Sequence, residues 1–326
     1  MALGTHPDTA AQAPVPPRPV RWLPRRVQSR AWLRGLALAS VIANVVIVVT
    51  GGAVRLTNSG LGCPTWPRCT DSTLTPTKAY AIHGIIEFSN RQLTFVLAVI
   101  AVATWLVAMA LRDQRGPATL AALGIPAQAV LGGFTVLTHL NPWLVAAHFL
   151  LSMAILAVTF LLWWRLRSAP DVRLGVPGPM TLLTRLTLLV TAAALVIGTV
   201  VTGSGPHAGD KDASGKVHRT GLNVASMAQL HADSVWVLVG LTVGLVLLAW
   251  ALHAAEPVRR AAVWLLGIEL AQGVIGYTQY FLHVPPLLVG LHMLGACLVW
   301  VCALRVLLVA RPSRNVRDAQ NSWVSA

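Results

Sequence analysis

The chain has 326 residues, of which 55% are hydrophobic and 11% are charged, and its mean hydropathy is +0.66. This composition excludes a soluble globular domain, because apolar runs of about 20 residues recur along the chain and suit membrane spans. The formal net charge of +14 would be compatible with nucleic-acid binding. The basic residues flank the apolar runs, however, so no nucleic-acid partner is expected.

Eight apolar runs predict an all-α integral membrane protein with eight transmembrane helices. A bundle of buried core helices is the weaker alternative, because so many runs share one chain. In chain order, the spans are predicted at residues 33–54, 82–111, 118–139, 143–164, 182–203, 225–252, 261–282 and 286–309.

Lys and Arg are distributed unevenly between the two sets of connections. Most of them precede the first span, follow the last span or lie beside the even-numbered connections. The positive-inside rule therefore predicts a multi-pass protein of the plasma membrane with both termini in the cytoplasm. Residues 1–32 and 310–326 are predicted to be disordered cytoplasmic tails, and the first of them lacks the apolar region of a cleaved signal peptide. The opposite connections contain only Arg55, Arg68, Lys78, Lys211, Lys216 and Arg219.

Cys63 and Cys69 lie in the first connection, residues 55–81, which the predicted topology places on the outer face. A disulfide is expected there, and both a structural and a redox-active role are open. Cys297 and Cys302 in the last span are interpreted as small apolar residues.

An internal repeat divides the chain. A shift of 144 aligns residues 127–148 with residues 271–292 without a gap. The repeat predicts two four-helix halves, residues 33–164 and 182–309, joined by a cytoplasmic linker at 165–181. Because four spans return the chain to its starting side, a pseudo-twofold axis along the membrane normal should relate the halves. The identical positions are Ala127, Gln128, Val130, Gly132, His139, Pro142, Leu144, Val145 and His148.

Histidines of the predicted spans follow the repeat. The shift of 144 superimposes His148 on His292, and a shift of 141 places Asn90 on His231. Two histidines from facing helices, His231 and His292, predict a clamp for a heme iron. His83 lies two turns before Asn90 and is the candidate for the missing ligand of the first half, although another role is equally open. The alternative for all of them is a packed, hydrogen-bonded histidine.

The segment "HGIIEFSNRQLT", residues 83–94, is unusual for a membrane span because ionisable groups are costly in lipid. Glu87 shares a helical face with His83 and Asn90, and Arg91 follows it at the i+4 position. An internal ion pair is one interpretation. The other is that Glu87 acts on a ligand bound by the first half, while Arg91 pairs with a heme propionate.

With these features, residues 35–310 resemble the heme A synthase family. The resemblance rests on "GGAVRLTNSGLGCPTWPRC" and "IIEFSNR", on His148 in "VAAHFLLSM", on His231 in "QLHADSVW" and on His292 in "VGLHMLGA". Members of this family oxidise a methyl group of heme O to the formyl group of heme A by successive hydroxylations.

The resemblance implies a role for each half. His231 and His292 would hold a heme B cofactor, and the first half would receive heme O beside His148 and Glu87, which matches the essential glutamate of the family. Asn90 departs from the family pattern, in which a histidine often precedes the motif's arginine. Expected partners are a heme O synthase, an unidentified electron donor and the lipid bilayer, and a homo-oligomer is left open. The heme sites should face the outer side.

Two other functions are weighed against the synthase. A non-catalytic heme carrier or assembly factor would keep the histidines, but it has no evident need for Glu87 in one half only. A di-heme electron-transfer cytochrome would need redox centres near both faces, whereas all candidate ligands lie toward the outer face.

Overall fold

The computed structural model describes residue 24 and residues 27–76, 81–167, 176–211 and 214–310, so most of both predicted tails lies outside the described part. Within it, the model contains eight helices long and apolar enough to cross a membrane, and the expected all-α membrane fold is confirmed. The helices are α1 (Arg30–Leu56), α2 (Ala81–Leu111), α3 (Arg115–Leu137), α4 (Pro142–Arg165), α5 (Gly178–Ser204), α6 (Val224–Ala251), α7 (Glu256–Phe281) and α8 (Pro286–Val309).

Local sequence signals set the helix ends. Asn141 and Asn223 cap α4 and α6 by accepting main-chain N–H groups of Trp143 and Ser226. Helices α5 and α7 begin at residues 178 and 256 with proline in the first turn, whereas the hydropathy pattern predicts 182 and 261. Hydropathy locates the apolar middle of a span and misses polar turns beyond it, which explains the difference.

The α3–α4 and α7–α8 connections have the same backbone form. His139 and Leu140 have φ of 53° and 59°, and His283 and Val284 have φ of 59° and 55°. His139 and His283 therefore terminate helices in tight turns. These two histidines are related by the 144 shift, so the repeat extends to the backbone conformation.

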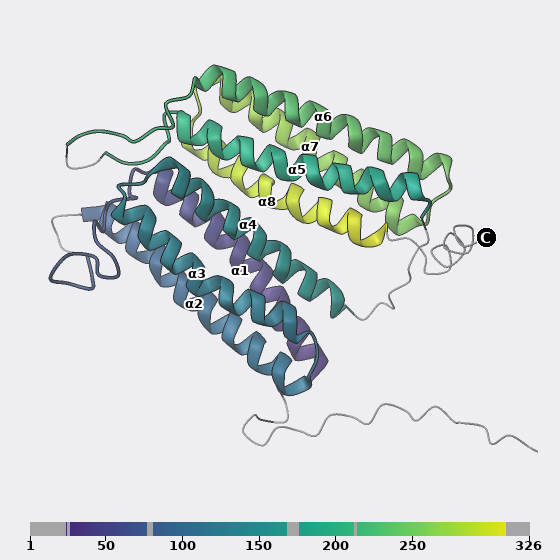
Figure 1. Ribbon diagram of the computed structural model, residues 1–326, viewed down its shortest axis with the longest axis horizontal. Helices are drawn as coiled ribbons and strands as arrows, with labels where there is room; N and C mark the ends of the chain where they lie inside the picture. Colours follow the sequence, from purple (N-terminus) through teal and green to yellow (C-terminus); the bar gives the residue numbers. More distant parts are fainter. Residues whose placement is uncertain (1–23, 25–26, 77–80, 168–175, 212–213, 311–326) are drawn as a thin grey trace, which may run out of the picture.

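The helices form two sets of four, α1–α4 and α5–α8 (Figure 1). Within each set every helix contacts the next one and the first contacts the last, so that α2 lies diagonal to α4 and α6 lies diagonal to α8. The sets meet along α1, α4, α5 and α8. An axis of symmetry between them remains a prediction.

Large apolar side chains cover the outside of the helices. Phe95 and Val99 on α2, Leu189 on α5 and Leu247 on α6 are each at least 65% exposed. Exposed apolar surface of this kind is unfavourable in water and favourable against lipid chains. The protein is therefore a multi-pass membrane protein, while its orientation remains a prediction.

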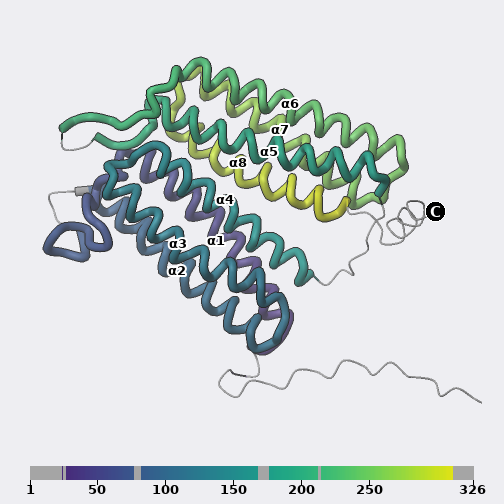
Figure 2. The backbone as a smooth tube through the Cα atoms, viewed as in Figure 1, coloured from purple at the N-terminus to yellow at the C-terminus, as the bar shows by residue number. Residues whose placement is uncertain are grey.

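The two sets are joined at the end of the bundle that carries the cysteine loop, here called the cysteine end (Figure 2). Arg55, at the end of α1, donates to the main-chain carbonyls of Ala208 at 2.7 Å, of Thr202 at 3.4 Å and of His207. The ring of His207 in turn lies 2.9 Å from the carbonyl of Val284. A half-buried guanidinium thus connects the first set to the loop after α5.

Candidate functional site

His231 and His292 face each other across the second set. They lie in the first third of α6 and α8, and their ring centres are 6.3 Å apart. Two metal–nitrogen bonds of about 2 Å, together with roughly 1 Å from each ring nitrogen to its ring centre, span about 6 Å. The two imidazoles are therefore separated by the distance at which they would bind one iron from opposite sides.

The rings of His148, His231 and His292 each pack against a glycine of the preceding helix. A methyl group at Gly198 would lie 3.2 Å from Cε1 of His231, and a methyl group at Gly276 would lie 3.4 Å from Cε1 of His292. At Gly132 the corresponding distance to Cε1 of His148 is 3.1 Å. These distances are short for carbon–carbon contacts, so each ring occupies the space that a side chain would fill.

The polar atoms of these rings are consistent with a missing ligand. Nδ1 of His148, His231 and His292 is buried, and none of the three atoms has a hydrogen-bond partner. Buried polar groups in proteins are nearly always satisfied, so three such atoms at the predicted sites are consistent with a bound group. Oε1 of Gln128 and of Gln279 and Oε2 of Glu269 are buried without a partner as well. In the part of the chain that the model describes, no cluster of three or more His, Cys, Asp or Glu is arranged to hold a metal ion by itself. The donor set fits a porphyrin iron, which needs only axial ligands.

His148 and Asn90 belong to the first set. Gln128 donates to the main-chain carbonyl of His148 at 3.0 Å and also bonds to Ser152. These two bonds join α3 to α4 beside His148. Asn90 on α2 lies beside α1, where the hydroxyl of Thr50 donates to its Oδ1 at 2.8 Å. The model therefore places an amide, and no imidazole, at the position on α2 that corresponds to His231.

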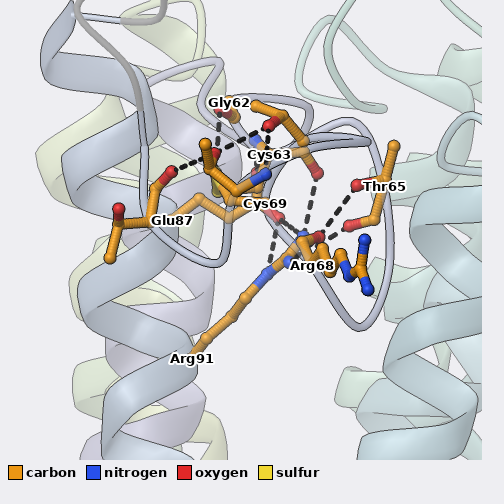
Figure 3. The surroundings of a disulfide bond; sticks show 10 residues. Gly62, Cys63, Thr65, Arg68, Cys69, Glu87 and Arg91 are labelled. Atoms are coloured by element: carbon orange, nitrogen blue, oxygen red, sulfur yellow. Dashed lines mark hydrogen bonds and ion pairs between the residues drawn. A yellow bond between two sulfur atoms is a disulfide. The ribbon is translucent and has the colours of Figure 1, made fainter.

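Glu87 is buried, with 5% of its surface exposed, and forms an ion pair with Arg91 at 2.5 Å. Its second oxygen accepts the main-chain N–H of Cys63 at 2.7 Å. Arg91 also donates to the carbonyls of Cys63, Thr65 and Arg68 at 2.8, 3.1 and 3.3 Å (Figure 3). The internal ion pair considered from the sequence is thus present, and it also ties the cysteine loop to α2.

The cysteine loop is closed by a disulfide between Cys63 and Cys69, whose side chains are fully buried. His83, in the first turn of α2, is exposed, and its Nδ1 lies 2.9 Å from the hydroxyl of Ser59. The model thus brings His83 together with the loop before α2 and leaves it two helical turns from Asn90.

Sequence analysis missed several parts of this arrangement. Gly132 was named only as a position of the repeat and Gly198 was not named, although Gly132 and Gly276 each stand 16 residues before a histidine. Glu269, which received no role, lies in the middle of α7 and is 2% exposed. It accepts the Thr242 hydroxyl at 3.0 Å, and its Oε2 is buried without a partner. A carboxylate in an apolar run was the available signal.

Eight membrane-spanning helices, with two histidines facing each other inside one four-helix set, define a polytopic membrane protein whose site suits heme iron. Comparison with known families agrees with this class. Residues 34–304 match the family described as cytochrome oxidase assembly protein (COX15-CtaA), and the chain belongs to this family.

Curated relatives carry a more specific name. Proteins named heme A synthase from Lysinibacillus sphaericus and Geobacillus thermodenitrificans are each 32% identical to this chain, over 141 and 164 residues. These matches cover 42% and 48% of this chain and 45% and 50% of the relatives. A heme A synthase from Shewanella oneidensis is 25% identical over 179 residues. The chain therefore spans about half the length of the curated relatives it matches.

Proposed function

We propose that this chain is a heme A synthase, which oxidises a methyl group of heme O to the formyl group of heme A. The observation that supports this proposal best is the difference between the two helix sets. The second set has two facing imidazoles at 6.3 Å, and the first has one histidine together with the buried carboxylate Glu87. The family and the names of its relatives agree with the proposal.

In the second set, His231 and His292 would hold a heme B. Such a group accepts and releases single electrons, and imidazoles on both faces leave it no free coordination position. The glycines at positions 198 and 276 fix the two rings from behind. The role of the protein in this set is therefore to hold an electron carrier.

In the first set, heme O would bind beside His148 near the cysteine end. Arg91 and the N–H of Cys63 each bind one oxygen of Glu87 and so orient its carboxylate. In an apolar site a fixed carboxylate can hold a proton or stabilise a developing positive charge. Every guanidinium nitrogen of Arg91 donates either to Glu87 or to a loop carbonyl. Arg91 is therefore assigned to positioning Glu87 and the loop instead of binding a propionate.

The reaction needs partners outside the chain. Each hydroxylation takes one oxygen atom from dioxygen, consumes two electrons and two protons, and releases one water molecule. The second hydroxylation gives a geminal diol, which loses water to leave the aldehyde. We assign the supply of heme O to a heme O synthase and the electrons to an unidentified donor. The proposed location is the plasma membrane, with both termini cytoplasmic and the sites near the outer face.

The test is the chemical identity of the hemes that the protein carries. Wild type, Glu87→Gln and the matched control Glu269→Gln are co-expressed with a heme O synthase and purified in detergent, and their extracted hemes are identified by chromatography and mass. Wild type and the control should contain heme A or hydroxylated heme O, and Glu87→Gln should keep heme B but lose the oxidised products. Heme B with unmodified heme O in all three proteins would instead identify a carrier or a cytochrome.

A further inference from the structure

We propose that the first helix set holds its heme through His148 alone, and that Asn90 leaves the opposite face of that heme without a protein ligand. The inference rests on the proposed function, because it assumes that the first set binds a heme. It concerns a position at which the two sets differ in their candidate ligands, Asn90 in the first and His231 in the second.

Four helix pairs present the same arrangement, a glycine on the odd-numbered helix beside a polar side chain on the next helix. Three of these side chains are the histidines at positions 148, 231 and 292. The fourth is Asn90, whose Nδ2 would lie 3.8 Å from a methyl group at Gly51. Asn90 thus occupies on α2 the place that His231 occupies on α6.

The contacts of Asn90 turn its amide toward α1. Thr50 donates to Oδ1 at 2.8 Å, and Nδ2 lies beside Gly51 on the same helix. An asparagine side chain is also shorter than histidine, and amide oxygens suit Mg²⁺ or Ca²⁺ better than heme iron, for which imidazole is the usual ligand. Asn90 therefore fills the ring position without replacing the ligand.

No neighbouring group that the model describes takes over this role. His83 lies seven residues earlier, which is about 10 Å along the helix axis, and it is exposed with its ring against Ser59. Glu87 is engaged by Arg91 and by the main-chain N–H of Cys63. Of the candidate ligands in the first set, only His148 combines a ring packed against glycine with a buried Nδ1 that has no partner.

The two sets therefore differ in access to iron. A small ligand has a free coordination position in the first set, whereas both axial positions of the second set are filled by imidazoles. Carbon monoxide is a suitable probe because it binds ferrous heme only where an axial position is free or weakly occupied.

The experiment titrates reduced, heme-loaded full-length protein with carbon monoxide and counts the bound molecules per protein from the absorbance change. Wild type should bind one molecule while carrying two hemes. Asn90→His should keep both hemes and bind carbon monoxide at least tenfold more weakly, because the new imidazole occupies the free face. His83→Ala should behave as wild type. His148→Ala should lose the heme that binds carbon monoxide.

Wild type that binds no carbon monoxide while both sites are loaded would overturn the inference, as would binding that arises only in His83→Ala. If Asn90→His does not fold, imidazole is titrated into wild type. One imidazole molecule should convert one heme to the low-spin spectrum, and the absence of this change would overturn the inference.

Heme products are measured in the same samples. Heme A without carbon monoxide binding would refute this inference alone, and binding that depends on His148 without oxidised heme would refute the proposed function alone.

Discussion

Replacing Arg91 by alanine should release the cysteine loop from α2. The substitution removes the donors to the carbonyls of Cys63, Thr65 and Arg68, and leaves Glu87 buried without a counter-ion. Loss of one member of a buried ion pair costs about 3–5 kcal/mol. The Arg91 side chain is 20% exposed and that of Glu87 is 7% exposed, so we take the lower limit. About 3 kcal/mol corresponds to a roughly 150-fold larger equilibrium constant for opening of the loop.

Amide hydrogen exchange of the peptide covering residues 61–70 measures this opening, because exchange of a protected amide follows its local opening equilibrium. Arg68→Ala is the matched control, since this exposed arginine of the same loop donates, among the residues that the structure describes, to the carbonyl of Asp71 at 3.2 Å. We expect exchange in Arg91→Ala to accelerate about 100-fold, with little change in the control. Equal exchange in both variants would show that the disulfide alone holds the loop, and would refute the role assigned to Arg91.

Three further predictions concern other parts of the molecule. Cys63→Ser should lower the stability of the loop by about 2 kcal/mol, because the disulfide closes a short ring, and the same exchange measurement should show faster opening. Gly198→Ala should weaken heme retention about tenfold through crowding of a histidine ring, whereas Gly240→Ala, with no neighbour within 4 Å, should leave the heme-to-protein absorbance ratio unchanged. Arg55→Met should remove about 2 kcal/mol of charge-assisted hydrogen bonding between the two sets and lower the melting temperature in detergent; an equal drop in Arg30→Met, whose side chain is 61% exposed, would contradict this reasoning.

The eight spans could be predicted from the sequence because transfer of a helix into lipid depends on its own composition. The hydrocarbon layer requires about 20 apolar residues whatever the neighbouring helices do. The helix ends were less accurate, and α7 begins five residues before the predicted span at residue 261. Charged residues such as Glu256 extend a helix beyond the lipid without adding to its hydropathy.

The repeat located part of the site as well. It related His148 to His292 and Asn90 to His231, because the two halves place polar side chains at the same depth in corresponding helices. Of the two partners of Glu87, only one could be predicted from the sequence. Its spacing indicated Arg91 as a partner, but the bond to the N–H of Cys63 joins residues 24 positions apart and required the folded loop.

The sequence by itself determined the class of protein, the eight spans, and the residue types that can bind a heme. Tertiary structure alone decided which rings face each other, that glycines on neighbouring helices make room for them, and that Arg55 reaches the loop of the other set. The physical reason is one of range. Hydropathy and helix periodicity are properties of neighbouring residues, whereas a separation of 6.3 Å between His231 and His292 depends on how two helices 61 residues apart pack.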